Sequence, residues 1–169
     1  NLMGSLKNHS ASQLGAIVIR DIIKNSGIDP AAISEVIAGQ VLTAGLGQNP
    51  ARQTSINAGI PDVVPSYTVN KVCGSGLKSI ALGFESIALG HNDIVIAGGQ
   101  ESMSLAMHAG YMRAGVKMGE VKLVDTMMYD GLTDIFSGNL MGITAENIAQ
   151  KFNITRQMQD EFAFNSQNK

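Results

Sequence analysis

Residues 70–79 read Asn-Lys-Val-Cys-Gly-Ser-Gly-Leu-Lys-Ser and contain the only cysteine of the chain, Cys73. The run Tyr-Thr-Val at 67–69 predicts a short strand before this segment, and the apolar residues after it recur with the period of a helix. Cys73 is therefore predicted to lie between a strand and the N-terminus of a helix. That helix is predicted to bury one apolar face, which consists of Leu77, Ile80, Ala81, Phe84, Ile87 and Ala88.

The position of Cys73 predicts a reactive thiol. Partial positive charge and free N–H groups at a helix N-terminus stabilise a thiolate. Gly74 and Gly76 allow a sharp turn and a close approach by another molecule. This is the plan of a nucleophile elbow with cysteine in place of serine. The alternative is an inert, buried cysteine, and the strand–Cys–Gly–x–Gly–helix context favours the nucleophile.

Composition excludes several classes of protein. A length of 169 residues favours one domain with a sizeable core, and 44% hydrophobic with 15% charged residues is a globular balance. The net charge of −2, without a cluster of Lys or Arg, argues against nucleic-acid binding. No apolar run reaches the length needed to cross a membrane, and one cysteine excludes an internal disulfide.

Further strands and helices alternate along the chain. Buried strands are predicted at 36–42 and 94–97, and a helix at 12–26 capped by Ser12. A second helix is predicted at 50–58, with Asn49 as its cap, Pro50 at its first position and Gly59 at its end. This alternation predicts an α/β fold with parallel strand pairing. Gly98 and Gly99 are predicted to form a turn after the second strand. They belong to the same edge of the sheet as Cys73, because strand ends and helix starts meet there.

The pattern changes after residue 102. Seven of the nine methionines lie between Met103 and Met141. They indicate either an adaptable surface for a flexible apolar ligand or an irregular core filled by methionine. Two helices are predicted next. Ile148 and Phe152 share a face of the first, and the second begins after Thr155 and carries Met158 and Phe162 inward.

Other candidate sites are weaker. The three histidines have no spacing that predicts a metal site. The segment 98–102 lacks the Lys-Ser/Thr of a P-loop and the spacing of a dinucleotide fingerprint, so it is interpreted as a backbone turn beside the site. Ser75 and Ser79 flank Cys73 without a base nearby in the sequence.

Six short motifs occur in the order in which one known family carries them. They are GQNPARQ at 47–53, NKVCGSGL at 70–77, AGGQESMS at 97–104, GVKMG at 115–119, DGLTD at 130–134 and TAEN at 144–147. On these motifs, essentially the whole chain resembles the N-terminal part of a thiolase, and it is most similar to the acetyl-CoA acetyltransferase branch.

The resemblance implies a specific chemistry. Thiolases join or split acyl-CoA thioesters through an acyl-cysteine intermediate, and the match places the nucleophile at Cys73. Gly98 and Gly99 would close the site from below, and Leu132 and Met141 match positions that line the pocket of the pantetheine arm. Coenzyme A thioesters are then substrates, and no cofactor or metal is expected. The residue before Met141, commonly histidine in the biosynthetic branch, is Leu140 here.

The resemblance also implies an organisation. Residues 1–102 would form the α/β domain, with helices layered on a mixed, mainly parallel sheet. Residues 103–141 would form a loop-domain segment that covers coenzyme A and mediates assembly, and residues 142–169 a helical continuation of it. The family's first strand, taken as central in the sheet between 36–42 and 94–97, would precede Asn1. The histidine and second cysteine of the family would follow Lys169, so the chain is interpreted as a fragment that is inactive alone.

Three further expectations concern the parent protein. Residues 111–119 resemble the loop that assembles acetyl-transferring thiolases into tetramers, so a homo-oligomer, dimer or tetramer, is predicted. A place in fatty acid metabolism in the cytoplasm, or in the mitochondrial matrix of a eukaryote, is also predicted. The alternatives are a long-chain 3-ketoacyl-CoA thiolase, a decarboxylating ketoacyl synthase and a noncatalytic lipid-binding relative.

Overall fold

The computed structural model describes residues 2–169, which divide after Gly131 into two compact units. The first unit contains the sheet and ends at Gly131, and the second runs Leu132–Lys169. This division falls inside the predicted segment 103–141. The predicted limits of functional domains at 102 and 141 stay predictions.

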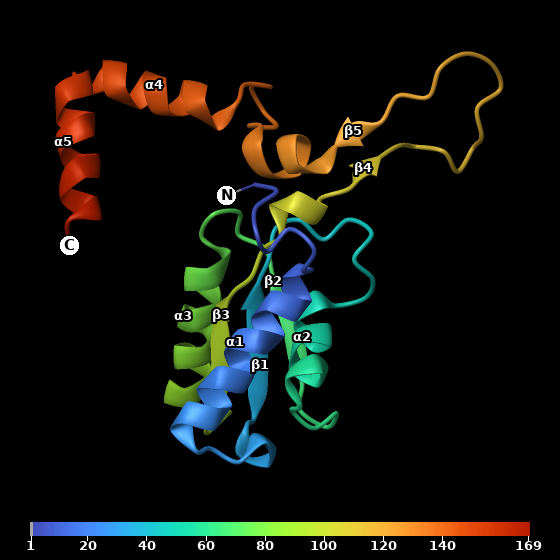
Figure 1. The fold of residues 1–169 in the computed structure, drawn as a ribbon, viewed down its shortest axis with the longest axis vertical. Helices are drawn as coiled ribbons and strands as arrows, with labels where there is room; N and C mark the ends of the chain where they lie inside the picture. Colours follow the sequence, from blue (N-terminus) through green and yellow to red (C-terminus); the bar gives the residue numbers. More distant parts are fainter. Residues whose placement is uncertain (1) are drawn as a thin grey trace. The chain divides into compact units, whose positions relative to one another are not determined.

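Three parallel strands form the sheet of the first unit (Figure 1). They are β1 (Glu35–Gly39), β2 (Ser66–Val69) and β3 (Val95–Gly99), in the order β2-β1-β3. The predicted α/β fold with parallel pairing is confirmed. The predicted place of the family's first strand between 36–42 and 94–97 is wrong, because β1 pairs directly with β3 from Glu35↔Val95 to Gly39↔Gly99. That such a strand precedes Asn1 stays a prediction.

The strand limits also correct the turn predicted at Gly98 and Gly99. Both glycines are the last residues of β3, paired with Ala38 and Gly39 of β1. The strand continues because its parallel partner continues beside it, and a glycine pair alone does not end a ladder. β1 itself stops at Gly39, earlier than the predicted 42.

Helices α1 (Ala11–Ser26) and α2 (Pro50–Ala58) lie against one face of the sheet, and α3 (Ser75–Ala88) lies against the other (Figure 1). α1 starts at a capping box between Ser10 and Gln13, so Ser10 rather than the predicted Ser12 is its cap. α2 has the predicted Asn49 cap, the proline at its first position and the predicted Gly59 end. A short 3-10 turn, Pro30–Ala32, precedes β1.

The main core lies between α1, α2 and the sheet. Successive strand side chains point to opposite faces, so Val36 and Ile96 face this core while Val95 and Ala97 face α3. The buried members of the core are Ala16, Ile19, Ile33, Val36, Ala58, Ile60 and Val64.

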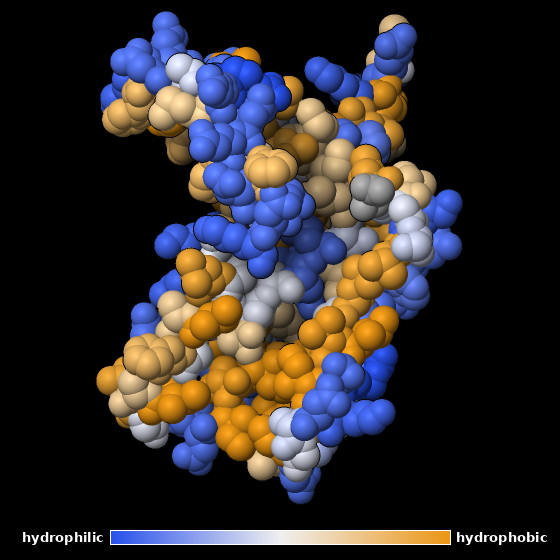
Figure 2. All heavy atoms as spheres, turned by 60° about the vertical axis from the view of Figure 1, so that its left-hand side comes forward, coloured by the Kyte–Doolittle hydropathy of each residue, from blue (hydrophilic) through white to orange (hydrophobic). Residues whose placement is uncertain are grey.

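The face of α3 that contacts the sheet is not the predicted one. Leu77 is 75% exposed and Phe84 73% exposed, whereas Ser75, Ser79 and Gly83 are buried. The reason is distance: a Cβ on Gly83 would be 3.1 Å from the Val95 side chain, so only small residues fit between helix and strands. The apolar face of α3 therefore points away from the sheet. Figure 2 shows apolar side chains gathered on this side of the unit.

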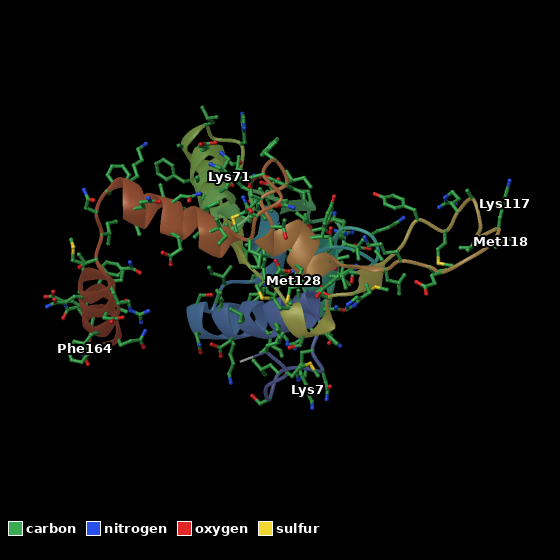
Figure 3. The ribbon with its side chains drawn as sticks, turned by 90° about the horizontal axis from the view of Figure 1, so that it is seen from above. Lys7, Lys71, Lys117, Met118, Met128 and Phe164 are labelled. Atoms are coloured by element: carbon green, nitrogen blue, oxygen red, sulfur yellow. The ribbon has the colours of Figure 1, made fainter. Side chains whose placement is uncertain are left out.

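A long hairpin extends from the same unit. β4 (His108–Ala109) pairs antiparallel with β5 (Val124–Asp125), and residues 110–123 between them are exposed throughout. Figure 3 shows Lys117 and Met118 at the tip of this loop, away from the sheet. Short helical turns flank the hairpin at Met103–Leu105 and Met127–Leu132.

Two helices make up most of the second unit, α4 (Met141–Lys151) and α5 (Arg156–Gln167). Thr155 caps α5 as predicted, accepting a hydrogen bond from the Met158 amide. The predicted inward direction of Met158 and Phe162 is wrong for the described chain. Ile148, Phe152, Met158 and Phe162 are each at least half exposed, because a single helix pair offers nothing to cover them.

Candidate active site

Cys73 lies where the sequence predicts it, between the end of β2 at Val69 and the start of α3 at Ser75. Its thiol is free and the residue is exposed. The exposure excludes a buried cysteine, and the reactivity of the thiol stays a prediction. Gly74 is the N-cap of α3 and offers no side chain to the first turn. The positive end of the helix therefore faces the segment that carries the thiol.

Val72, immediately before Cys73, has a left-handed backbone with φ 47°. A β-branched residue rarely adopts this conformation, because its Cβ substituents crowd the backbone. Such a conformation costs about 1–3 kcal/mol and persists only where neighbouring contacts impose it. It bends the chain sharply between strand and helix, which is the geometry of a nucleophile elbow.

Hydrogen bonds from Ser75 hold this bend. Its buried hydroxyl accepts from the Lys71 amide at 2.8 Å and donates to the Val72 carbonyl at 2.6 Å. Two backbone bonds tighten the same turn, from Gly74 N to Lys71 O at 3.0 Å and from Ser75 N to Val72 O at 3.1 Å. The role of Ser75 was not predicted. A serine at a turn next to a helix start was the signal, since such hydroxyls bond to nearby backbone.

Glycines from three elements meet under the elbow. A Cβ on Gly39 of β1 would overlap the backbone of Ser75 and Gly76. A Cβ on Gly76 would be 3.3 Å from Gly99 Cα. The predicted glycines Gly76 and Gly99 are thus brought together. Gly39 was not predicted as part of the site, and its position at the end of a strand was the available signal. Gly74 lies beside Lys71, labelled in Figure 3, and Gly98 faces open space.

Ser79, one turn further along α3, fixes the helix to β3. Its buried hydroxyl shares its one proton between two carbonyl acceptors, Gly98 at 2.8 Å and Gly76 at 2.6 Å. Ser79 is thus a second buried serine of α3 with two backbone partners, and neither partner belongs to the bend at Val72.

Glu101, two residues after β3, connects the C-terminal ends of β1 and β3. Its carboxylate accepts from the Val41 amide at 2.8 Å and from the Leu42 amide at 3.3 Å. Burial raises the pKa of Glu101 above its ordinary value, and hydrogen bonds from the amides of Val41, Leu42 and Ser102 oppose this rise. The sequence reasoning missed this residue. A carboxylate directly after a buried strand was the available signal.

A glutamine pair adds to the same connection. The Gln100 side chain donates to Gln40 Oε1 at 2.8 Å and accepts from the Thr54 hydroxyl at 2.7 Å. β3 is an edge strand among residues 2–169. A hollow of about 290 Å³ lies between this edge and α1, lined mainly by apolar side chains such as Leu14, Val18 and Ile22.

Leu132 and Met141 lie close together in their own region. An antiparallel bridge joins Thr133 to Leu140. Leu132 precedes the first residue of this bridge and Met141 follows the second, so the two lie next to each other on the same side of it. Met141 is 40% exposed. Their predicted contact with the pantetheine arm is not tested by this arrangement and stays a prediction.

Residues 2–169 lack the features of two other classes of site. Within this range, no three His, Cys, Asp or Glu side chains gather in a way that would hold a metal ion. In the same part of the chain, no helix combines the length and the apolar character of a membrane span.

Known proteins resemble the whole chain. It is 56% identical over 167 residues to an acetyl-CoA acetyltransferase of Cupriavidus necator, covering 98% of this chain and 42% of that protein. It is 53% identical over 169 residues to an acetyl-CoA acetyltransferase of Paracoccus denitrificans, covering 100% of this chain and 43% of the relative. The chain therefore spans less than half the length of these relatives.

A solved structure and a family profile agree with these relatives. The crystal structure of Acat5 thiolase from Ascaris suum in complex with coenzyme A superposes with a TM-score of 0.91 at 41% identity, covering 98% of this chain and 43% of that one. The profile of the thiolase N-terminal domain matches residues 1–169. The resemblance that the six motifs indicated is confirmed, and the chain belongs to the thiolase N-terminal domain family.

Proposed function

We propose that the parent protein of this chain is an acetyl-CoA C-acetyltransferase that forms or cleaves acetoacetyl-CoA, with Cys73 as its acyl-accepting nucleophile. The observation that carries the proposal is the exposed Cys73 thiol in a strained elbow at the start of α3. The names of relatives that are more than 50% identical support the acetyl substrate.

The proposed reaction has two half-reactions. The Cys73 thiolate attacks the thioester carbonyl of acetyl-CoA, the carbon–sulfur bond to coenzyme A breaks, and coenzyme A leaves with a proton. The carbanion of a second acetyl-CoA then attacks the acetyl-cysteine carbonyl, and the Cys73 thiolate leaves as acetoacetyl-CoA forms. Covalent catalysis divides one difficult exchange into two easier steps. Both steps need positioned acid–base groups, which we expect in the longer parent protein.

The two units would have separate tasks in this reaction. The elbow of the first unit would hold the acyl group on Cys73. Leu132 and Met141 would contact the pantetheine arm, which is apolar enough to pack on such side chains. The Ascaris thiolase, crystallised with coenzyme A, supports an acyl-CoA as the substrate class.

The test is to locate the acyl group. The full-length parent is incubated with isotopically labelled acetyl-CoA, quenched in acid and analysed by peptide mass spectrometry. We expect the label on Cys73 in the parent and in Ser79→Ala, and none in Cys73→Ala. Label on another residue would overturn the assignment. Turnover with malonyl thioesters would favour a ketoacyl synthase, and a preference for long 3-ketoacyl chains would favour the degradative branch.

We further propose that residues 111–124 mediate assembly of the parent into a homo-oligomer. Tyr111 near the base of the loop is fully exposed and Met118 at its tip is 94% exposed, and exposed large apolar side chains are typical of contact surfaces. Deleting the loop from the parent should convert a tetramer into a dimer, measured by light scattering. An unchanged mass would contradict the proposal. A cytoplasmic location of the parent stays a prediction, supported by the bacterial relatives.

A further inference from the structure

The strained residue of the elbow needs an external restraint. Val72 is the residue directly before Cys73, and its backbone occupies the left-handed region. Its own side chain does not impose this, since it is 47% exposed and packs little. The restraint must therefore come from hydrogen bonds to the backbone on either side of Val72.

Two side chains bond to this backbone. Asn70 Oδ1 accepts from the Val72 amide at 3.0 Å, and Ser75 is the side chain that bonds on both sides of the bend. Its hydroxyl bonds to the amide before Val72, at Lys71, and to the carbonyl of Val72 itself. One oxygen thus joins both ends of the bent peptide segment. The hydroxyl is in turn fixed from below, because Gly39 allows the backbone of Ser75 to rest directly on β1.

We propose that Ser75 is a positioning residue that holds Val72 in its left-handed conformation and so aims the Cys73 thiol at the substrate position. The inference rests on the proposed function, because it takes Cys73 as the nucleophile. It differs from a packing role in that the restraint is on a backbone dihedral angle. If position 72 held a residue that adopts this dihedral angle without strain, the hydroxyl of Ser75 should no longer be needed.

The first measurement compares Ser75→Ala with Ser79→Ala in the full-length parent. Both substitutions remove from the same helix a buried hydroxyl with two backbone partners, and only Ser75 contacts the bend. For Ser75→Ala we expect kcat for acetoacetyl-CoA cleavage and the rate of Cys73 alkylation by iodoacetamide to fall about tenfold or more, since small misplacements of a reacting group have large effects. KM should stay within about twofold. Ser79→Ala should lower Tm similarly and leave both rates near those of the parent.

The decisive measurement is a rescue. Glycine adopts a positive φ without strain, so Val72→Gly should restore most of the lost alkylation rate and kcat in the Ser75→Ala background. Equal loss of rate in Ser75→Ala and Ser79→Ala would overturn the proposal, as would a double variant no faster than Ser75→Ala.

The labelling experiment separates this inference from the proposed function. If the parent carries its acetyl label on Cys73 and Ser75→Ala retains full rates, only the positioning role fails. If the parent carries the label elsewhere, the proposed function fails first. If Ser75→Ala does not fold, the double variant Val72→Gly/Ser75→Ala is compared with Val72→Gly alone instead. Nearly equal rates in that pair support the proposal, and a tenfold difference overturns it.

Discussion

The two long faces of α3 differ in a way that their sequences do not suggest. One face, with Ser75, Ser79 and Gly83, is buried on the sheet, and the other, with Leu77 and Phe84, is exposed. Close contact between a helix and strand backbones demands small residues, and the site needs this contact because the elbow rests on it. The apolar face is therefore free to serve a second contact. Helical periodicity identifies the apolar face of a helix that is expected to be buried. It does not identify the part of the protein that buries it.

The largest effect should come from filling the buried face. Gly39→Ala would force a Cβ into the backbone of Ser75 and Gly76, where no flexible side chain can move aside. We expect a loss of about 3 kcal/mol or more in the free energy of unfolding of the parent, at the upper end for overpacking. Chemical denaturation measures it.

The matched control is Gly98→Ala on the neighbouring strand. Gly98 has open space around the position of a Cβ and an ordinary φ, so its replacement should change stability by no more than about 0.5 kcal/mol. A similar loss in both variants would show that β-strand glycines are sensitive in general, and that the contact between β1 and α3 is not the cause.

The exposed face should give a smaller effect that depends on the length of the chain. We predict that the part of the parent absent from this chain covers Phe84. Phe84→Ser should then lower the free energy of unfolding of the parent by about 3 kcal/mol, as for other buried Phe truncations. In the 169-residue chain, Phe84 is 73% exposed. The same change should there reduce binding of an apolar fluorescent dye and leave the free energy of unfolding unchanged.

The neighbouring Glu85→Ala is the control for both proteins, because Glu85 is exposed and its ion pair with Lys78 at 3.8 Å is weak. A parent that tolerates Phe84→Ser as well as Glu85→Ala would contradict the predicted cover. The same 169-residue chain also tests the expectation that it lacks activity alone, by assay of acetoacetyl-CoA cleavage.

The contrast between the faces marks the limit of prediction from the sequence. The α2 helix was predicted with both ends, because its cap, its proline and its final glycine are local signals. The position of Cys73 between strand and helix was predicted for the same reason. The direction of α3, the contact at Gly39 and the Glu101 bonds were missed. They depend on residues far apart in the sequence, 60 positions in the case of Glu101 and Val41.

The smallest predicted effect concerns Glu101, which ties together the strands on which the buried face rests. Burial raises the pKa of Glu101 in the folded protein above its ordinary value of 4.5. The folded state therefore binds the proton more tightly than the unfolded state, and this contribution to stability is complete below pH 4.5. It is lost as the pH rises through the folded pKa.

The measurement compares the parent with Glu101→Gln by chemical denaturation between pH 4 and pH 8. The stability advantage of the parent over the variant should shrink as the pH rises, because glutamine does not titrate. Asp160→Asn should show the opposite trend when the measurement is extended below pH 3.8. The hydrogen bond from Arg156 lowers the pKa of Asp160 below its ordinary value of 3.8, so its stabilisation is complete above that pH and is lost as the pH falls further. If the advantage over Glu101→Gln grew with pH, the amide hydrogen bonds of Val41 and Leu42 would outweigh burial. Glu101 would then act as a charged clamp on the strand exits.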